Sequence, residues 1–148
     1  MRTLIVGYGN PLRGDDGLGW HVVERLRAAV QDPSVEILAL HQLTPELMDP
    51  IGRADRVIFI DAAVGAVPGE IAERTVERQA GSGAAFSHHA TPAALLAGAL
   101  ALYGRAPEAT LITVTGADFS VSDQLSEAVN RQLEKVAGAV LGLMRQGW

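Results

Sequence analysis

The sequence predicts an α/β fold, a three-layer α/β/α sandwich with a mostly parallel, twisted sheet, in a single domain over residues 1–148. Three observations predict it. Short apolar runs alternate along the chain with segments whose apolar residues recur at helical spacing, the pattern of strands joined by crossover helices. The length of 148 residues suits one domain with a substantial core, and no repeat or linker interrupts it. Aromatic residues make up only 5%, so we expect a largely aliphatic core.

The first elements are a strand, a loop and a helix. Residues 3–6 are a β-branched run, as expected for a strand buried on both faces. Residues 7–19 are dense in Gly, Pro, Asn and Asp and predict a loop. Apolar residues recur at helical spacing from Leu18 onward, and we expect Asp15 or Asp16 to cap this helix.

Two further strands flank a short helix. Residues 35–40 predict a strand, and residues 45–51 predict a helix with proline in its first turn. Residues 56–60 are again continuously apolar after the first position and predict a third strand. Asp61 directly follows this predicted strand.

The second half of the chain continues the alternation. Residues 71–76 alternate weakly and predict an edge strand, and residues 79–86 are rich in Gly, Ser and Ala and predict a flexible loop. A strongly apolar helix is predicted from 92 to 103, and a buried strand from 111 to 115. The last and longest helix is predicted over residues 122–144, with apolar residues on one stripe.

The composition excludes several classes of function. The net charge is -5 and Lys135 is the only lysine, which argues against nucleic acid or an anionic membrane as the main partner. Cysteine is absent, which excludes disulfides, thiolate metal sites and a cysteine nucleophile. No apolar run approaches the roughly 20 residues that span a bilayer, and the opening residues 1–7 are too short an apolar run for a signal peptide. We therefore expect a cytoplasmic protein without membrane insertion.

Both phosphate-binding fingerprints fail in the glycine-rich loop. The dinucleotide pattern G-x-G-x-x-G requires a third glycine where Leu12 stands. The phosphate loop G-x-x-x-x-G-K-[ST] matches the spacing of Gly9 and Gly14, but Asp15 and Asp16 replace its Lys and Ser/Thr. Two carboxylates here would repel a phosphate, and they suit a cation instead.

The acid pair has a structural interpretation beside the functional one. Acidic residues in a first turn commonly cap a helix and complement its dipole, with a contribution on the order of 1 kcal/mol. A helix cap needs only one acidic residue, so capping explains either Asp15 or Asp16 but not both.

Two more pieces carry candidate ligands. Asp61 follows the third predicted strand, at the edge where open α/β sheets bind ligands, although an acid that begins a turn is the structural alternative. His88 and His89 follow the predicted flexible loop, and in an extended chain only one of them faces a given site. The remaining histidines, His21 and His41, are interpreted as structural.

One imidazole and two carboxylates suit an open site for a borderline divalent metal such as nickel or zinc. Three protein ligands leave positions for water or for a substrate's own ligands. Neither H-E-x-x-H nor G-x-S-x-G occurs, so a conventional zinc protease and a serine nucleophile elbow are not indicated. Ser87 beside His88 is no nucleophile and base pair, because neighbouring side chains on an extended segment point apart.

Four motifs follow one another along the chain and cover nearly all of it. They are Gly7-x-Gly9-Asn10-x-Leu12-x-x-Asp15-Asp16-Gly17-x-Gly19, then Phe59-Ile60-Asp61-Ala62, then Ser87-His88 running into Pro92 and Leu95-Leu96, and lastly Thr115-Gly116-Ala117-Asp118-Phe119-Ser120 followed by Leu125-Ser126. Together these motifs resemble the hydrogenase maturation endopeptidases.

The resemblance implies an α/β sandwich with a twisted central sheet and an endopeptidase activity. The implied reaction removes the C-terminal extension of a nickel-iron hydrogenase large-subunit precursor, and only after nickel has been inserted. This precursor is the implied partner. Nickel is the implied cofactor, carried by the substrate, and other divalent metals can occupy the site in the isolated protein.

The resemblance also implies roles for single residues. Asp16, Asp61 and His88 correspond to the family's metal contacts, and His89 is the alternative to His88. Shared coordination would let the protease sense the nickel directly, since an empty precursor lacks this anchor. For the chemistry, Asp16 or Asp61 could activate water as a general base, or the metal could polarise the scissile carbonyl. Both routes stay open.

Other functions fit parts of the same pattern. They are an α/β peptidase with another substrate, a non-catalytic nickel carrier or assembly chaperone, a nucleotide-binding regulatory domain, and a purely structural module. Metal binding by the isolated protein does not separate the first two from the maturation protease, whereas cleavage of a precursor does.

Overall fold

The structure is a computed structural model that describes residues 1–77 and 90–146. Residues 78–89 and 147–148 lie outside the described residues. The predicted loop 79–86 falls in the first of these gaps, and so do His88 and His89.

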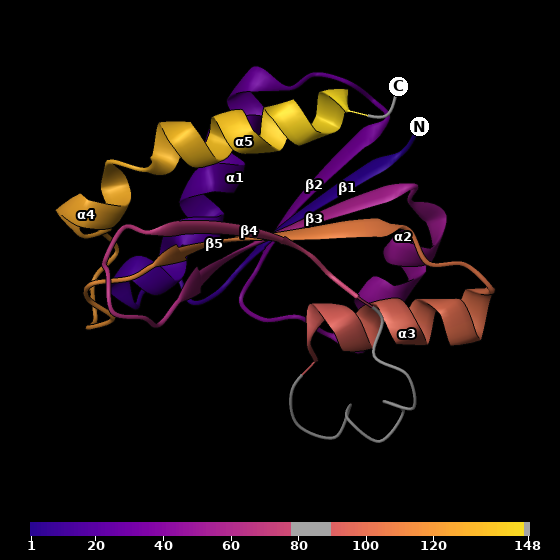
Figure 1. Cartoon of the computed structure of the whole chain (residues 1–148), viewed down its shortest axis with the longest axis horizontal. Coiled ribbons are helices and arrows are strands. Elements are labelled where there is room, and N and C mark those ends of the chain that lie inside the picture. The colour runs from indigo at the N-terminus through magenta and orange to yellow at the C-terminus, as the bar shows by residue number, and fades with distance from the viewer. Residues whose placement is uncertain (78–89, 147–148) are drawn as a thin grey trace.

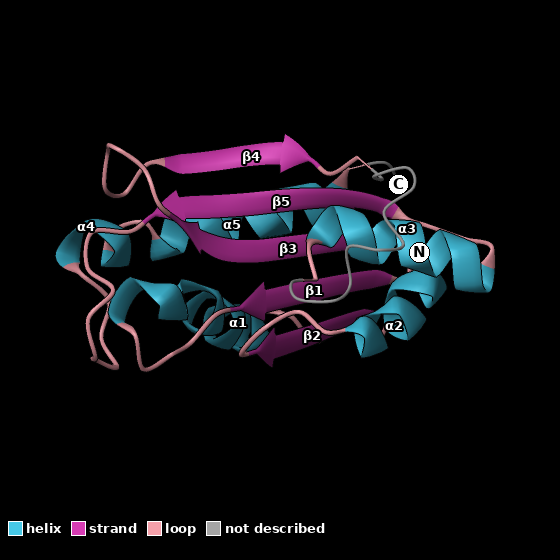
Figure 2. Cartoon of the chain, turned by 90° about the horizontal axis from the view of Figure 1, so that it is seen from below, coloured by secondary structure: helices cyan, strands magenta, loops and turns pink. Residues whose placement is uncertain are grey.

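One twisted sheet forms the middle layer of the described chain (Figures 1 and 2). Its strands run in the order β2-β1-β3-β5-β4, and all pair in parallel except β4, which is antiparallel to β5. The strands are β1 (Thr3–Tyr8), β2 (Val35–Leu40), β3 (Arg56–Ala63), β4 (Ile71–Thr75) and β5 (Glu108–Thr115). The predicted α/β class, the mostly parallel sheet and the edge strand are confirmed.

Helices cover both faces of the sheet. One face carries α1 (Leu18–Ala29) and α5 (Leu133–Arg145), preceded by the short α4 (Glu127–Asn130) (Figure 1). The other face carries α2 (Met48–Arg53), which continues a 3-10 turn at Pro45–Leu47, and α3 (Pro92–Tyr103). Figure 2 shows α2 and α3 over the amino-terminal half of the parallel strands. Among the described residues no helix is long and apolar enough to cross a membrane.

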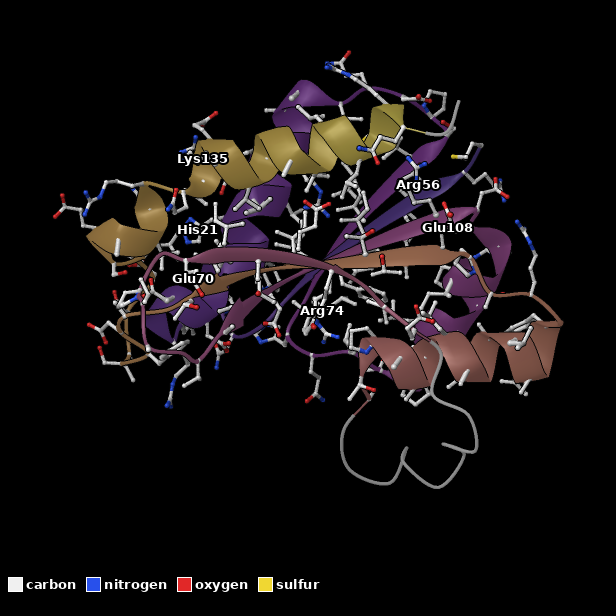
Figure 3. The ribbon with its side chains drawn as sticks, in the orientation of Figure 1. His21, Arg56, Glu70, Arg74, Glu108 and Lys135 are labelled. Carbon is white, nitrogen blue, oxygen red and sulfur yellow. The ribbon has the colours of Figure 1, made fainter. Side chains whose placement is uncertain are left out.

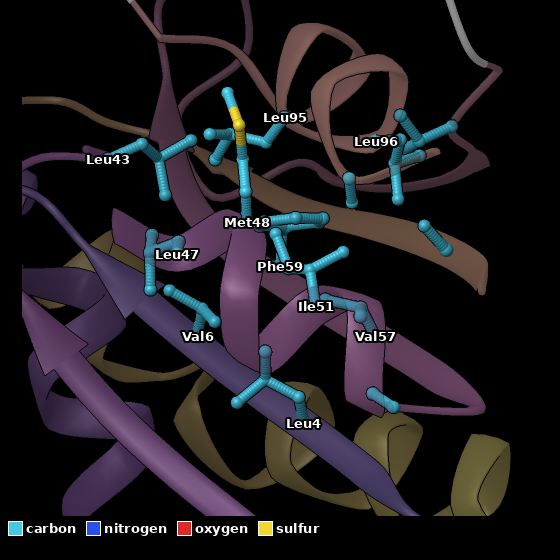
Figure 4. Packing of buried hydrophobic residues seen from close by; sticks show 14 of the residues in the cluster. Leu4, Val6, Leu43, Leu47, Met48, Ile51, Val57, Phe59, Leu95 and Leu96 are labelled. Carbon is cyan, nitrogen blue, oxygen red and sulfur yellow. The ribbon is translucent and has the colours of Figure 1, made fainter. Parts of the chain in front are cut away.

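The two faces of the sheet bury two separate, largely aliphatic clusters. On β1, Leu4 and Val6 face α2 and α3, while Ile5 faces α1 and α5. On β3, Phe59 belongs to the first cluster, which Figure 4 shows, and Ile60 belongs to the second. A strand covered on both sides needs apolar residues at every position, which explains the uninterrupted apolar runs in the sequence.

The predicted helix over residues 122–144 is wrong at its start. Residues 122–126 are irregular, and helical structure is divided between α4 and α5. The Ser126 hydroxyl accepts a hydrogen bond from the Val129 N–H at 3.4 Å and caps α4. The Ser126 N–H points to Asp15 instead of a carbonyl in a preceding helical turn. A helix therefore cannot extend back through this residue.

The third strand is longer than predicted. β3 runs to Ala63, and Asp61 pairs with Thr113 of β5 inside the ladder. Asp61 therefore stands on the sheet itself, with its backbone held by the ladder, rather than in a turn beyond the strand.

Candidate active site

A hollow of about 380 Å³ lies at the carboxyl ends of β1, β2 and β3. This is the edge where an open α/β sheet binds its ligands. The residues that line the hollow are Tyr8, Gly9, Asp16, His41, Gln42, Leu43, Thr44, Pro45, Asp61 and Ala90. The fold thus brings together Asp16 and Asp61, the two carboxylates that the sequence predicts at one site.

The predicted helix cap is wrong for both acids of the pair. The N-cap of α1 is Gly17, and no side chain caps it. A 3-10 turn over Gly14–Gly17 precedes the helix and directs the two acids to different places. Asp15 points into the protein, and Asp16 points to the hollow.

Asp15 is fully buried and holds the loop after β5. Its carboxylate accepts hydrogen bonds from the N–H groups of Ala117 at 2.7 Å and Asp118 at 3.0 Å. It also accepts from the N–H of Ser126 at 2.7 Å and from its hydroxyl at 2.8 Å. A buried carboxylate needs such donors, so the role of Asp15 is structural. Its partners lie in the fourth motif of the sequence.

Asp16 is held at the hollow by the glycine-rich loop. Its carboxylate accepts a hydrogen bond from the Asn10 N–H at 2.7 Å. Gly9 has φ +138°, and a Cβ there would lie 2.1 Å from the Asp16 carbonyl oxygen. Only glycine permits both this conformation and this approach. The glycine of the motif therefore serves the packing of the acid rather than a phosphate.

Asp61 lies beside Asp16 in the hollow and is largely buried. Burial raises the pKa of Asp61 to about 6, and the charge of Asp16 adds to the rise. Hydrogen bonds from the Tyr8 hydroxyl and the Ala62 N–H oppose it by lowering the pKa. A carboxyl group that titrates near neutral pH is suited to proton transfer.

Among the lining residues, two with titratable side chains, Tyr8 and His41, were not predicted as site residues. Tyr8 ends β1, and its hydroxyl donates a hydrogen bond to Asp61. Burial raises the pKa of this phenol above its ordinary value. His41, interpreted from the sequence as structural and as part of a regular element, lies just past β2 and lines the hollow. Its ring packs edge-on against the Trp20 ring, with ring centroids 5.4 Å apart. The sequence signal for both is their place after an apolar strand run.

The Trp20 ring that supports His41 is itself fixed. Its Nε1–H donates to the Gly9 carbonyl at 2.9 Å and to the Leu40 carbonyl at 3.2 Å. The ends of β1 and β2 are thereby joined at the hollow. His21, in contrast, lies on α1 on the opposite side of the sheet from α3 (Figure 3).

The donor set of the hollow suits a divalent cation in part. Asp16 and Asp61 supply two carboxylates, which bind nickel or zinc when an imidazole completes the site. His88 and His89, the predicted third ligands, lie outside the described residues. Within the described ranges, no three His, Cys, Asp or Glu side chains are grouped to hold a metal ion.

Comparisons with known proteins point to one family. A family model described as HycI, hydrogenase maturation protease, matches residues 20–143. Comparison with curated proteins gave no match.

Solved structures agree with the family match. The hydrogenase maturating endopeptidase HybD from E. coli superposes with a TM-score of 0.80 at 28% identity, covering 99% of this chain and 93% of that one. The [NiFe] hydrogenase maturation protease HycI from Thermococcus kodakarensis gives 0.77 at 27% identity, with 98% and 93% covered. A hydrogenase 2 maturation peptidase from a Thaumarchaeota archaeon gives 0.74 at 26% identity, with 97% and 98% covered.

Proposed function

Because this chain belongs to the hydrogenase maturation protease family, whose model matches residues 20–143, we propose that it removes the C-terminal extension of a nickel-iron hydrogenase large-subunit precursor after nickel insertion. As a family member it is a peptidase that acts in hydrogenase maturation. The observation that carries the finer proposal is the hollow, where Asp16 and Asp61 meet at the carboxyl ends of the strands.

Recognition of nickel rests on these two carboxylates and an imidazole. Asp16, Asp61 and His88, with His89 as the alternative, contact the nickel that the precursor's own ligands already hold. Carboxylate and imidazole groups are suitable ligands for nickel. A precursor without nickel lacks this anchor and is not cut. The metal is therefore part of the substrate, and the protease senses its presence directly.

We assign Asp61 as the general base of the two carboxylates. In the protein free of the precursor its pKa is about 6, so the carboxylate is ionised at neutral pH and can take a proton from water while the water oxygen attacks the scissile carbonyl carbon. When the C–N bond breaks, this proton passes to the leaving amine. Polarisation of the carbonyl by the precursor's nickel is the alternative source of activation. Asp16 then contributes by binding the metal and by raising the pKa of its neighbour.

Exposed aliphatic side chains at the same end of the sheet suit a protein substrate. Leu12 and Val121 are 59% and 83% exposed, and their loops are joined by a hydrogen bond of 3.0 Å from the Ser122 N–H to the Leu12 carbonyl. Val64 and Val67, in the turn between β3 and β4, are also exposed. Where exposed apolar residues gather into a patch, they are typical of contacts with another protein. These loops would receive the folded body of the precursor while its tail enters the hollow.

Mass spectrometry of a large-subunit precursor from the same organism tests the proposal. The precursor is mixed with this protein in two forms, one with nickel inserted and one without. Loss of a C-terminal peptide from the nickel-loaded form alone is the expected result. Cleavage of both forms would contradict recognition through nickel. Stable binding without cleavage of either form would favour the carrier or chaperone function instead.

A further inference from the structure

The phenol of Tyr8 contacts Asp61, but the function proposed above assigns no role to Tyr8. β1 and β3 are parallel neighbours, and the pairing of Gly7 with Ile60 places Tyr8 and Asp61 at the next position along the two strands. The Tyr8 hydroxyl donates a hydrogen bond to the Asp61 carboxylate. Both side chains line the hollow.

The Tyr8 ring has little freedom to move. It packs edge-on against Phe59, with ring centroids 6.5 Å apart and an interplanar angle of 87°. Phe59 is fully buried in the cluster between the sheet and α3, and Leu40 of β2 packs beside the same cluster. Edge-to-face pairs of this kind are a preferred arrangement and stabilise the position of the ring by about 0.5–1.5 kcal/mol. The hydroxyl is therefore presented from a rigid support.

The hydrogen bond leaves part of the Asp61 carboxylate available. A carboxylate offers about four lone-pair positions on two oxygens. The Tyr8 hydroxyl and the Ala62 N–H occupy two of them. A phenol is protonated at neutral pH, so Tyr8 acts toward Asp61 as a donor. About two positions therefore remain for a ligand in the hollow, which Asp61 lines.

We propose that Tyr8 is a positioning residue for Asp61, whose hydroxyl holds one carboxylate oxygen toward β1 and directs the other into the hollow toward the bound metal. The inference rests on the proposed function, since the metal is the nickel of the precursor. Without the phenol, the carboxylate can rotate and must lose this freedom each time a metal binds. Loss of such an outer partner typically weakens metal binding about 10- to 100-fold.

Substitution Tyr8→Phe isolates the hydroxyl, because phenylalanine keeps the ring and its contact with Phe59. The chain offers a matched control in Tyr103, its only other tyrosine, which is 52% exposed at the end of α3. Three intact proteins are compared: the parent, Tyr8→Phe and Tyr103→Phe. Each is freed of metal with a chelator and then titrated with Ni²⁺ and, separately, with Co²⁺. Calorimetry gives the affinity, and the visible absorption of bound Co²⁺ reports the ligand geometry.

We expect Tyr8→Phe to bind both ions about 10- to 100-fold more weakly and to change the Co²⁺ spectrum, with a melting temperature like that of the parent. Tyr103→Phe should match the parent in all three measurements. Equal affinity and an unchanged spectrum in Tyr8→Phe would overturn the assignment, as would a large fall in its melting temperature, which would mark Tyr8 as structural. Failure of the parent to bind either ion would overturn both this inference and recognition through the carboxylates. The protease activity is decided separately, by cleavage of the precursor.

Discussion

The carboxylate of Asp15 accepts hydrogen bonds from both the backbone N–H and the hydroxyl of Ser126, at 2.7 and 2.8 Å. The two residues are 111 positions apart in the sequence. Their contact fastens the loop after β5 to the loop that carries Asp16. Successive residues of a 3-10 turn point about 120° apart. An inward Asp15 therefore leaves Asp16 free to face the hollow.

Replacement of Asp15 should lower the stability of the protein more than replacement of the neighbouring Asp16. Asp15→Asn removes the charge and replaces one acceptor oxygen with an NH2 group that faces hydrogen-bond donors, and each hydrogen bond to a buried charge contributes about 1.5–3 kcal/mol. We expect a loss of about 2–4 kcal/mol in the free energy of unfolding, measured by urea denaturation. Asp16→Asn is the matched control and should change stability by less than about 1 kcal/mol. Equal stability of the two variants would contradict the structural role of Asp15.

Replacement of Asp16 or Asp61 should abolish processing without unfolding the protein. Asn has the size of Asp but supplies neither a carboxylate ligand nor a base near neutral pH. We expect at least a roughly 100-fold loss in the rate of precursor cleavage for each variant, on the scale of general-base loss. The rate is measured by mass spectrometry on the nickel-loaded precursor, and circular dichroism verifies the fold. Full activity in either variant would remove that residue from the proposed site.

The charge of Asp61 should make stability depend on pH. Its carboxyl has a pKa of about 6 in the folded protein against an ordinary 3.8, so the folded state holds the proton more tightly. The stability from this group is fully present below pH 3.8 and is lost as the pH rises through about 6.

Asp61→Asn has no ionisable group at this position, so it should not lose stability in this way as the pH rises. A tenfold difference in proton affinity between the folded and unfolded states corresponds to about 1.4 kcal/mol. Relative to the parent, the variant should therefore gain about 2 kcal/mol in free energy of unfolding between about pH 4 and pH 7. Urea denaturation at the two pH values, with a chelator present, measures the difference. A difference between variant and parent that does not change with pH would show that burial leaves the pKa of Asp61 in its ordinary range.

The exposed aliphatic loops should contribute to binding of the precursor rather than to chemistry. Val121→Asp places a charge on the loop beside Leu12, and we expect KM for the precursor to rise about 10-fold, which corresponds to about 1.4 kcal/mol, while kcat stays close to the parent value. Leu102→Asp is the control, because Leu102 is 68% exposed but lies near the distant end of α3. If both variants showed the same KM, these loops would not be the docking surface.

The sequence by itself determined the alternation of strands and helices, because apolar periodicity is a local property of the backbone. It also indicated that Asp16 and Asp61 belong together. Both follow or end a predicted parallel strand, and the carboxyl ends of such strands meet at one edge. The glycines of the first motif were visible as a pattern, although the packing of Gly9 against Asp16 was not.

Only the tertiary structure decided which acid of the pair is structural and which faces the hollow. The donors that bury Asp15 come from a loop more than 100 residues away, and no spacing rule carries that information. The same contact ends the helix predicted from residue 122, because Ser126 is already bound to Asp15. Tyr8 and His41 enter the site for a similar reason. A side chain at a strand end acquires its partners from neighbouring strands, whose order in space is set by packing of the whole chain.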